Sequence, residues 1–169
     1  MAPTEWLDNR AVLKSQDLQR FIDGHRVDAV ILSLDRHTPT VSDAAIALGV
    51  DAAQIIKTLV FIVKGNPLLV IGNGLARIDR RKLAEHLSIG RRWVKLAAAE
   101  QALAITGYVV GSMPPFGHKQ KLRTVIDSAV KEMKIVFGGG GDINAMMRLA
   151  SDELLRVTTA EIADISERP

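Results

Sequence analysis

The amino-acid sequence predicts one domain of the mixed-sheet α/β or α+β class. The length of 169 residues fits a single domain, which we expect to span residues 1–169 with residues 1–24 as an N-terminal helical extension. Segments with helical spacing interleave with segments rich in β-branched residues, but without the regular βαβ period of a parallel sheet. Aromatic residues make up only 4% of the chain, so the core must consist mostly of Val, Ile, Leu and Ala.

The helices are predicted from apolar spacing and from residues that begin or end helices. The first helix contains apolar residues between Val12 and Ile22 and ends near Gly24. Thr40-Val-Ser-Asp43 has the form of a capping box and begins a short helix that ends at Gly49. Further helical segments are expected after Asp51, from Arg80 to Leu87 behind the cap Asp79, from Ala98 to Ile105, and from Asp152 to Arg156 behind the cap Ser151.

The strands are predicted from runs of β-branched and aromatic residues. They cover residues 27–34, 58–63, 68–71, 93–96, 124–126 and 135–137. A turn at Gly65-Asn66-Pro67 indicates that two of these strands form a hairpin. From Ile143 to Leu149 apolar residues recur at every second position, which favours another strand. Residues 162–165 supply a last apolar element.

The composition excludes several classes of active site. The absence of cysteine removes disulfides, thiolate nucleophiles and cysteine zinc sites. The histidines are scattered without an i, i+4 pair, so we predict no metal and no other cofactor. The nucleophile elbow and the P-loop pattern are also missing. We expect a cytoplasmic protein without membrane contact, because residues 1–10 do not read as a signal peptide and no apolar run approaches the roughly 20 residues of a membrane span.

The positive charge is concentrated in two places. The net charge is only +3, but one cluster opposed by few acidic residues consists of Arg77, Arg80, Arg81, Lys82, Arg91, Arg92 and Lys95. A second group consists of Lys119, Lys121 and Arg123. Such clusters can neutralise the phosphates of a nucleic acid, or they can form an ordinary solvated surface, and the composition leaves both interpretations open.

Lys57 is the first residue that could carry chemistry. It follows a short helical turn and comes directly before an apolar strand. An ammonium group in this place can hold an anion or a developing oxyanion. It can equally be a lysine at the rim of the core that extends to water.

The segment Gly111-Ser-Met-Pro-Pro-Phe-Gly-His118 is the second candidate. Its prolines and glycines suit neither a helix nor a strand, so it must form a shaped loop. The loop can present N–H groups and His118 to a ligand, or it can be a rigid turn with an exposed histidine. His118 is a candidate proton donor or base, but no Asp or Ser stands at a recognisable triad spacing.

The run Gly138–Gly141, followed by Asp142, is the third candidate. Glycines allow a substrate to approach the backbone closely and expose its N–H groups. The alternative is a flexible turn between two strands. Because a strand rather than a helix is predicted after the run, a nucleoside triphosphate site is not expected.

Taken together and in order, these segments resemble the YbaK / prolyl-tRNA-synthetase-associated editing family. The matching segments are Gln54-Ile-Ile-Lys57-Thr-Leu-Val-Phe61, Thr106-Gly-Tyr-Val-Val-Gly111, Pro115-Phe-Gly-His118, Ile126-Asp127 and Val136-Phe-Gly-Gly-Gly-Gly141. Residues 38–45 and 154–165 also fit, so that the resemblance extends from residue 25 to residue 167.

The resemblance implies a compact domain around a mixed, barrel-like β-sheet flanked by helices. It also implies an enzyme that hydrolyses the ester between a wrong amino acid and the 3′ end of a tRNA, commonly the tRNA for proline. Such an ester is already activated, so the protein need only hold it, stabilise the oxyanion and admit water or a neighbouring substrate group.

The resemblance also implies functional residues. Lys57, Gly111 and His118 are expected to take part in catalysis. The expected substrate-binding residues are Thr58, Pro115, Phe116, Gly117, Gly138, Gly139, Gly140 and Asp152. Because phosphates attract guanidinium groups, we expect tRNA contacts at Arg80, Arg81, Arg91 and Arg92.

The expected partner is a mischarged aminoacyl-tRNA, first of all tRNA for proline, and prolyl-tRNA synthetase is a second candidate. No synthetase or anticodon-binding module is recognised, which favours action in trans. Two alternatives stay open at this point. One is a non-catalytic module that binds aminoacyl-tRNA or a synthetase, and the other is a hydrolase of small aminoacyl esters.

Overall fold

The computed structural model describes residues 12–167, so the interpretation of residues 1–10 lies outside the described residues. The helices are α1 (Ser15–Gly24), α2 (Val41–Leu48), η3 (Ala52–Gln54), α3 (Arg80–Leu87), η4 (Arg91–Trp93), α4 (Ala99–Thr106), α5 (Ser128–Lys131) and α6 (Ser151–Thr158). The strands are β1 (Ala29–Ser33), β2 (Ile56–Val63), β3 (Asn66–Asn73), β4 (Val94–Leu96), β5 (Thr124–Asp127), β6 (Ile135–Gly139), β7 (Ala145–Ala150) and β8 (Glu161–Ala163).

The strands form two open sheets. One sheet has the order β1-β7-β6, and its strands are antiparallel. The other has the order β4-β2-β3-β5-β8, in which β5 runs parallel to both of its neighbours. A bridge between Ile55 and Phe137 connects the two sheets. The predicted mixed-sheet α/β class is therefore confirmed, although the strands do not close into a barrel.

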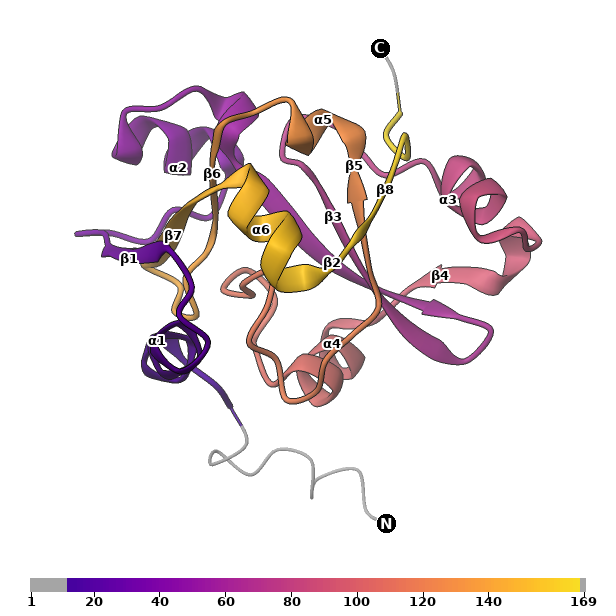
Figure 1. The fold of residues 1–169 in the computed structure, drawn as a ribbon, viewed down its shortest axis with the longest axis horizontal. Helices are drawn as coiled ribbons and strands as arrows, with labels where there is room; N and C mark the ends of the chain where they lie inside the picture. Colours follow the sequence, from indigo (N-terminus) through magenta and orange to yellow (C-terminus); the bar gives the residue numbers. More distant parts are fainter. Residues whose placement is uncertain (1–11, 168–169) are drawn as a thin grey trace.

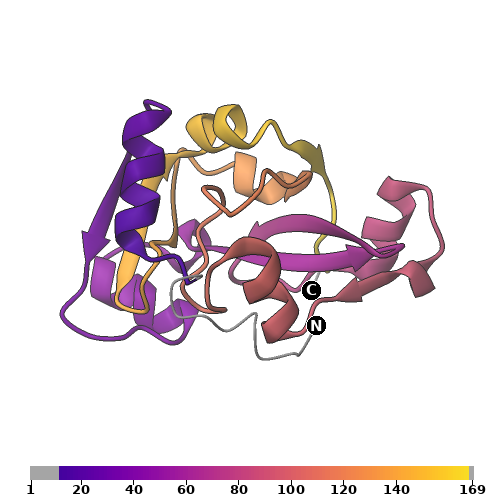
Figure 2. The ribbon, with the colours of Figure 1, turned by 90° about the horizontal axis from the view of Figure 1, so that it is seen from below.

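The long β2–β3 hairpin lies in the middle of the five-stranded sheet. Figure 1 shows α2 near one end of the hairpin and α3 at the other end. Figure 2 shows α1 upright at the end opposite α3, beside β1. No helix within residues 12–167 is long and apolar enough to cross a membrane.

The hairpin turn differs from the predicted one. The turn consists of Lys64 and Gly65, both with positive φ (48° and 81°), whereas Asn66 and Pro67 already pair with β2. Two residues with positive φ match the right-handed twist of the strands. Pro67 is tolerated because its nitrogen, like that of Leu69, faces the β5 side, where pairing begins only at Leu69.

The helix caps follow the predictions with one exception. Thr40 Oγ1 accepts the N–H of Asp43 at 3.0 Å, and α2 ends at Gly49 with a φ of 67°. Asp79 caps α3 in the same manner. Ser151 is instead the first residue of α6, because β7 leads directly into the helix and places Ala150 at the N-cap.

Two apolar clusters pack against the opposite faces of the five-stranded sheet. Alternate β3 residues point to opposite faces, with Leu69 and Ile71 in the larger cluster and Leu68 and Val70 in the smaller one. Helices α1, α4 and α6 contribute to the larger cluster, whereas α3 covers the opposite face. The large cluster also includes residues 113 and 116, so the loop after α4 is anchored in the core.

Candidate functional site

A pocket opens where β2 changes its strand partner. Ile55 bridges to β6, whereas residues 61–63 pair with β4. The stretch between these pairings has no strand neighbour on that edge within the described part of the chain. A cavity of about 250 Å³ lies beside Lys57 and Thr58, and we call it the Lys57 pocket.

Segments distant in the sequence wall the Lys57 pocket. They are the start of β2, the N-terminal part of α2, the loop after α4, and the facing ends of β6 and β7. The lining residues are Thr38, Pro39, Thr40, Val41, Ala44, Ile55, Ile56, Lys57, Thr58, Leu59, Val110, Gly111, Met113, Gly139 and Met146. The pocket thus combines mostly apolar walls with a single charged side chain.

The two neighbouring polar side chains on β2 have no partner among the residues that the structure describes. Thr58 Oγ1 is buried and lacks a hydrogen-bond partner among residues 12–167. Lys57 is half-buried and forms no ion pair with a described residue. A buried hydroxyl without a partner is uncommon, because burial costs it the hydrogen bonds it makes with water. Both groups are therefore available to a ligand.

The glycine run closes the pocket by backbone packing. A Cβ on Gly139 would lie only 2.2 Å from the carbonyl oxygen of Met113. The N–H groups of Gly140 and Gly141 are already donated to backbone carbonyls. The run therefore lets β6 approach the loop after α4, and it does not offer the free row of N–H groups of a phosphate-binding loop.

Gly111 lines the pocket for a different reason. Its φ is 97°, which disfavours any side chain, whereas a Cβ would have open space around it. The following residue, Ser112, is buried and its carbonyl accepts the N–H of Gly141. Glycine thus permits a sharp change of direction at the pocket mouth, and Ser112 fixes the loop to the glycine run.

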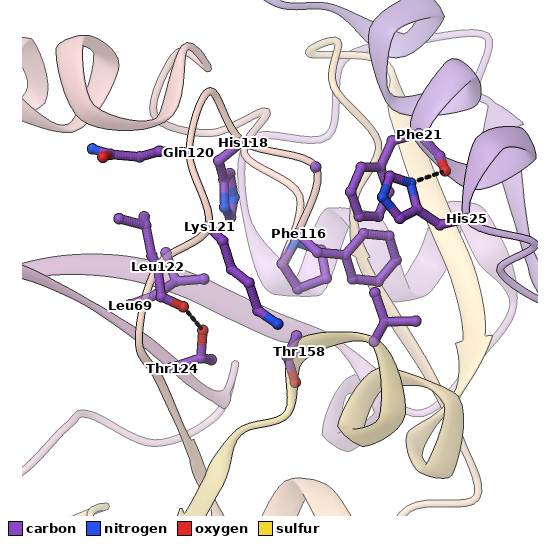
Figure 3. Close-up of a pocket in the computed structure, with 13 residues that line it drawn as sticks. Phe21, His25, Leu69, Phe116, His118, Gln120, Lys121, Leu122, Thr124 and Thr158 are labelled. Atoms are coloured by element: carbon purple, nitrogen blue, oxygen red, sulfur yellow. Dashed lines mark hydrogen bonds between the residues drawn. The ribbon is translucent and has the colours of Figure 1, made fainter.

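His118 lies in a second cavity on the other side of the same loop (Figure 3). This cavity of about 210 Å³ is lined by residues 115–118, and we call it the Phe116 cavity. His118 Nε2 donates to the carbonyl of Pro114 at 2.7 Å. Burial lowers the pKa of His118, and the hydrogen bond to Pro114 opposes this only in part. The histidine is therefore neutral near pH 7, and the structure does not bring it to Lys57.

The other predicted substrate-binding residues are divided between these places. Thr58 and Gly139 line the Lys57 pocket, whereas Pro115, Phe116 and Gly117 line the Phe116 cavity. Gly138 and Gly140 are buried beside these walls without lining either space. Asp152 is exposed in the first turn of α6 and also lines neither cavity.

The predicted tRNA-binding arginines lie at the far end of β2. Lys57 and Val63 are about 20 Å apart along the strand at about 3.3 Å per residue, and Val63 pairs with Val94 next to η4. Arg80 Nε donates to the carbonyl of Val94 at 2.9 Å. Arg92 lies 5.0 Å over the ring of Trp93. Arg81 forms an exposed pair with Glu85, and Arg91 is exposed.

The sequence did not single out the apolar walls of the Lys57 pocket. Met113 and Met146 meet there from the loop and from β7, and Val41 adds a third wall from α2. The alternation that marked β7 as a strand could not show that Met146 faces a cavity, because this depends on how the two sheets meet. The segment 38–45, which supplies Val41 and other lining residues, could be connected with the site because it is part of the family resemblance.

Comparisons with known proteins agree with this geometry. Residues 35–157 match the model of the aminoacyl-tRNA editing domain family. A protein of Enterococcus faecalis, named as a candidate Cys-tRNA(Pro)/Cys-tRNA(Cys) deacylase, is 26% identical over 123 residues, which are 72% of this chain and 74% of that protein. A proline–tRNA ligase of Streptococcus equi is 33% identical over 128 residues, covering 76% of this chain but only 20% of the ligase.

Solved structures show the same fold. A candidate trans-editing enzyme for prolyl-tRNA synthetase superimposes with a TM-score of 0.83 at 28% identity, covering 91% of this chain and 97% of that chain. A hypothetical protein, APE2540, superimposes with a TM-score of 0.82 at 32% identity, covering 89% and 99%.

The fold and the Lys57 pocket define a small α/β protein with a mostly apolar pocket that contains one lysine. The pocket lies at the sheet edge between the bridge at Ile55 and the pairing of β2 with β4. The family model covers more than half of the sequence, and the chain belongs to the aminoacyl-tRNA editing domain family. The family resemblance of the sequence is thereby confirmed.

Proposed function

We propose that this chain is a trans-acting hydrolase that removes a wrong, small amino acid from a tRNA, first of all from tRNA for proline. The observation that carries the proposal is that Lys57 and the buried Thr58 hydroxyl, which has no partner among the described residues, both line one small apolar pocket. The relatives named for deacylation of Cys-tRNA(Pro) and for trans-editing support it.

In the proposed complex the ester carbonyl faces the polar side of the pocket. Negative charge develops on its oxygen as the attacking oxygen adds to the carbon. The Lys57 ammonium is the donor that stabilises this charge, and it does so more strongly in a site that excludes water. The Thr58 hydroxyl, which leaves β2 on the other face of the strand, is free to bind another polar group of the substrate. Apolar walls formed by Val41, Met113 and Met146 receive the amino-acid side chain.

The substrate itself supplies the proton acceptor in this mechanism. None of the residues that line the Lys57 pocket is an Asp, Glu or His, so the pocket lacks the side chains that most often act as general bases near pH 7. The ester of an aminoacyl-tRNA lies next to a ribose hydroxyl and an α-amine, and either group can take part in the proton transfer. The protein contributes binding, orientation and stabilisation of charge.

The dimensions of the pocket limit the amino acid. A cavity of about 250 Å³ is smaller than the roughly 300–1,000 Å³ of sites for drug-sized ligands. Because the ester and the α-amine must enter the cavity together with the side chain, the space that remains suits a small side chain such as that of alanine or cysteine. One methylene group is worth only about 1–3 kcal/mol in such a pocket, so discrimination depends on the fit of the methionine side chains.

We place the tRNA contact on the exposed basic surface around η4. Arg81, Arg91 and Arg92 can neutralise phosphates, and the half-exposed Trp93 offers a ring on which a base can stack. Arg80 holds the Val94 carbonyl and thereby positions this surface. An RNA that lies along β2 reaches both this surface and the Lys57 pocket. Prolyl-tRNA synthetase is the second partner that we propose.

Deacylation assays test the proposed function. We would charge tRNA for proline with alanine, cysteine, serine or proline and compare wild type with Lys57→Ala and with the exposed control Lys131→Ala. Wild type and the control should release one noncognate amino acid rapidly, and Lys57→Ala should lower the rate about a hundredfold, as the loss of an oxyanion donor does.

The other outcomes are equally informative. Full activity in Lys57→Ala would refute the role of Lys57. Tight, salt-sensitive tRNA binding without turnover would favour a non-catalytic binding module. Turnover of small aminoacyl esters that does not depend on the tRNA body or on salt would favour a small-molecule hydrolase.

A further inference from the structure

The Phe116 cavity is a second cavity that the proposed deacylation does not use. It lies between α1, the loop that precedes β5, and the end of α6 (Figure 3). It shares no lining residue with the Lys57 pocket. Its volume of about 210 Å³ corresponds to about seven water molecules at about 30 Å³ each.

Most of the walls of this cavity are apolar, and its threonine hydroxyls have their hydrogen bonds satisfied. The rings of Phe21 and Phe116 stack at 5.4 Å between centroids, and Leu122 adds an aliphatic wall. The hydroxyls of Thr124 and Thr158 donate to backbone carbonyls at 3.0 and 2.7 Å. A ligand therefore meets a flat aromatic surface and aliphatic side chains, with few free polar groups.

The exposed polar side chains of Gln120 and Lys121 interrupt this apolar lining. Lys121 is the only Lys, Arg, Asp or Glu among the lining residues. Figure 3 shows its side chain directed along the cavity toward Phe116 and Thr158. It forms no ion pair with a described residue. Glu161, which shares a neighbouring surface hollow with Lys121, is held by Arg123 through two hydrogen bonds of 2.7 and 2.8 Å.

We propose that the Phe116 cavity binds a small carboxylic acid with an aromatic or branched apolar body. The carboxylate pairs with the Lys121 ammonium, and the apolar body lies against Phe116 and Leu122. The size of the cavity suits a ligand of roughly seven to ten non-hydrogen atoms. This inference does not depend on the proposed deacylation.

Charge and geometry disfavour other ligand classes. A cationic ligand would be repelled by Lys121, and the cavity has no carboxylate to hold it. A phosphate ester carries more charge than one ammonium group compensates, and the threonine hydroxyls already donate elsewhere. A neutral ligand of the same shape would bury the apolar surface without pairing the ammonium.

Ligand-observed and backbone-amide NMR titrations test the proposal. The probes are phenylacetate and its uncharged isostere phenylacetamide, added to wild type, Lys121→Met, Lys119→Met and Lys57→Ala. Phenylacetate should bind in the high-micromolar to millimolar range, as expected for so small a ligand, and shift the amides of residues 116–122. Phenylacetamide and Lys121→Met should each weaken binding about tenfold, because they remove a charge-assisted hydrogen bond.

The controls separate this site from the Lys57 pocket. Lys119→Met removes a neighbouring exposed lysine that does not line the cavity, and Lys57→Ala alters the other pocket. Both variants should bind phenylacetate as wild type does. Equal binding of acid and amide, equal binding by Lys121→Met, loss of binding in Lys57→Ala, or no binding at millimolar phenylacetate would each overturn the proposal. Unchanged amide spectra of the free variants would show that they are folded.

Discussion

The loop from Gly111 to His118 separates two cavities whose polar groups differ in what they bind. In the Lys57 pocket the Thr58 hydroxyl is buried without a partner within residues 12–167. In the Phe116 cavity the hydroxyl of Thr124 and the Nε2 of His118 are already bonded to backbone carbonyls. The first cavity keeps a buried hydroxyl for a ligand, whereas the second uses its threonine hydroxyls and His118 to hold its own walls and leaves the exposed Lys121 for a ligand. Hydrogen-bonding capacity therefore distinguishes the two better than their similar volumes do.

Substitutions of the two β6 glycines would show whether the close contact between β6 and the loop shapes the Lys57 pocket. Gly139→Ala should lower the free energy of unfolding by about 3 kcal/mol, because the new Cβ would lie 2.2 Å from the Met113 backbone. It should also lower the deacylation rate more than Gly138→Ala does. In Gly138→Ala the Cβ would meet the flexible end of Ile56 at 3.3 Å, so this variant should lose less than about 1 kcal/mol.

Urea unfolding and deacylation assays on both variants provide the measurement. Equal effects of the two substitutions would show that the contact between β6 and the first half of the loop is not what shapes the Lys57 pocket.

Removing one threonine hydroxyl from each cavity should give opposite results. Thr58→Val removes a buried hydroxyl that has no partner in the described part of the chain, so the free energy of unfolding should rise by about 1 kcal/mol while kcat/KM for deacylation falls about tenfold. Thr124→Val removes a hydroxyl bonded to the Leu122 carbonyl, so stability should fall by about 1 kcal/mol with deacylation unchanged.

The two readouts are urea midpoints and single-turnover deacylation rates. Thr58→Ser serves as the control, because it keeps the hydroxyl and should keep most of the activity. Thr58→Val with wild-type activity would mean that the unpartnered hydroxyl does not contact the substrate.

Most of the fold could be predicted from the sequence because its signals are local. The capping box at Thr40, the left-handed glycine at Gly49 and the cap at Asp79 each act within one turn of their own helix. The turn at Lys64 and Gly65 was missed, because a lysine with positive φ carries no sequence signal. The N-cap at Ala150 was missed because β7 continues into α6 without a turn.

The site could be predicted only in part, because its shape depends on contacts between distant segments. Lys57, Thr58 and Gly111 were found through their motifs and do line one pocket. The contiguous segment that ends at His118 was treated as one wall, but its two halves face different cavities. Which half faces Lys57 depends on the close approach of Gly139 to the loop, and no local pattern in the sequence records that approach.

The smallest expected effect concerns the pH dependence of stability at His118. Burial lowers the pKa of this histidine in the folded chain below the ordinary value of 6.5. Between the two values the unfolded chain binds more protons than the folded chain, so stability is present above about pH 6.5 and is lost as the pH falls below it. His118→Gln, which keeps a donor for the Pro114 carbonyl, should reduce the loss of stability between about pH 7.5 and about pH 5.5 by on the order of 1 kcal/mol. Urea midpoints at both pH values, with the exposed His37→Gln as the control, would measure it. The same loss in His118→Gln as in wild type would mean that His118 takes up its proton without cost, and that the second half of the loop is more open to water than the Phe116 cavity implies.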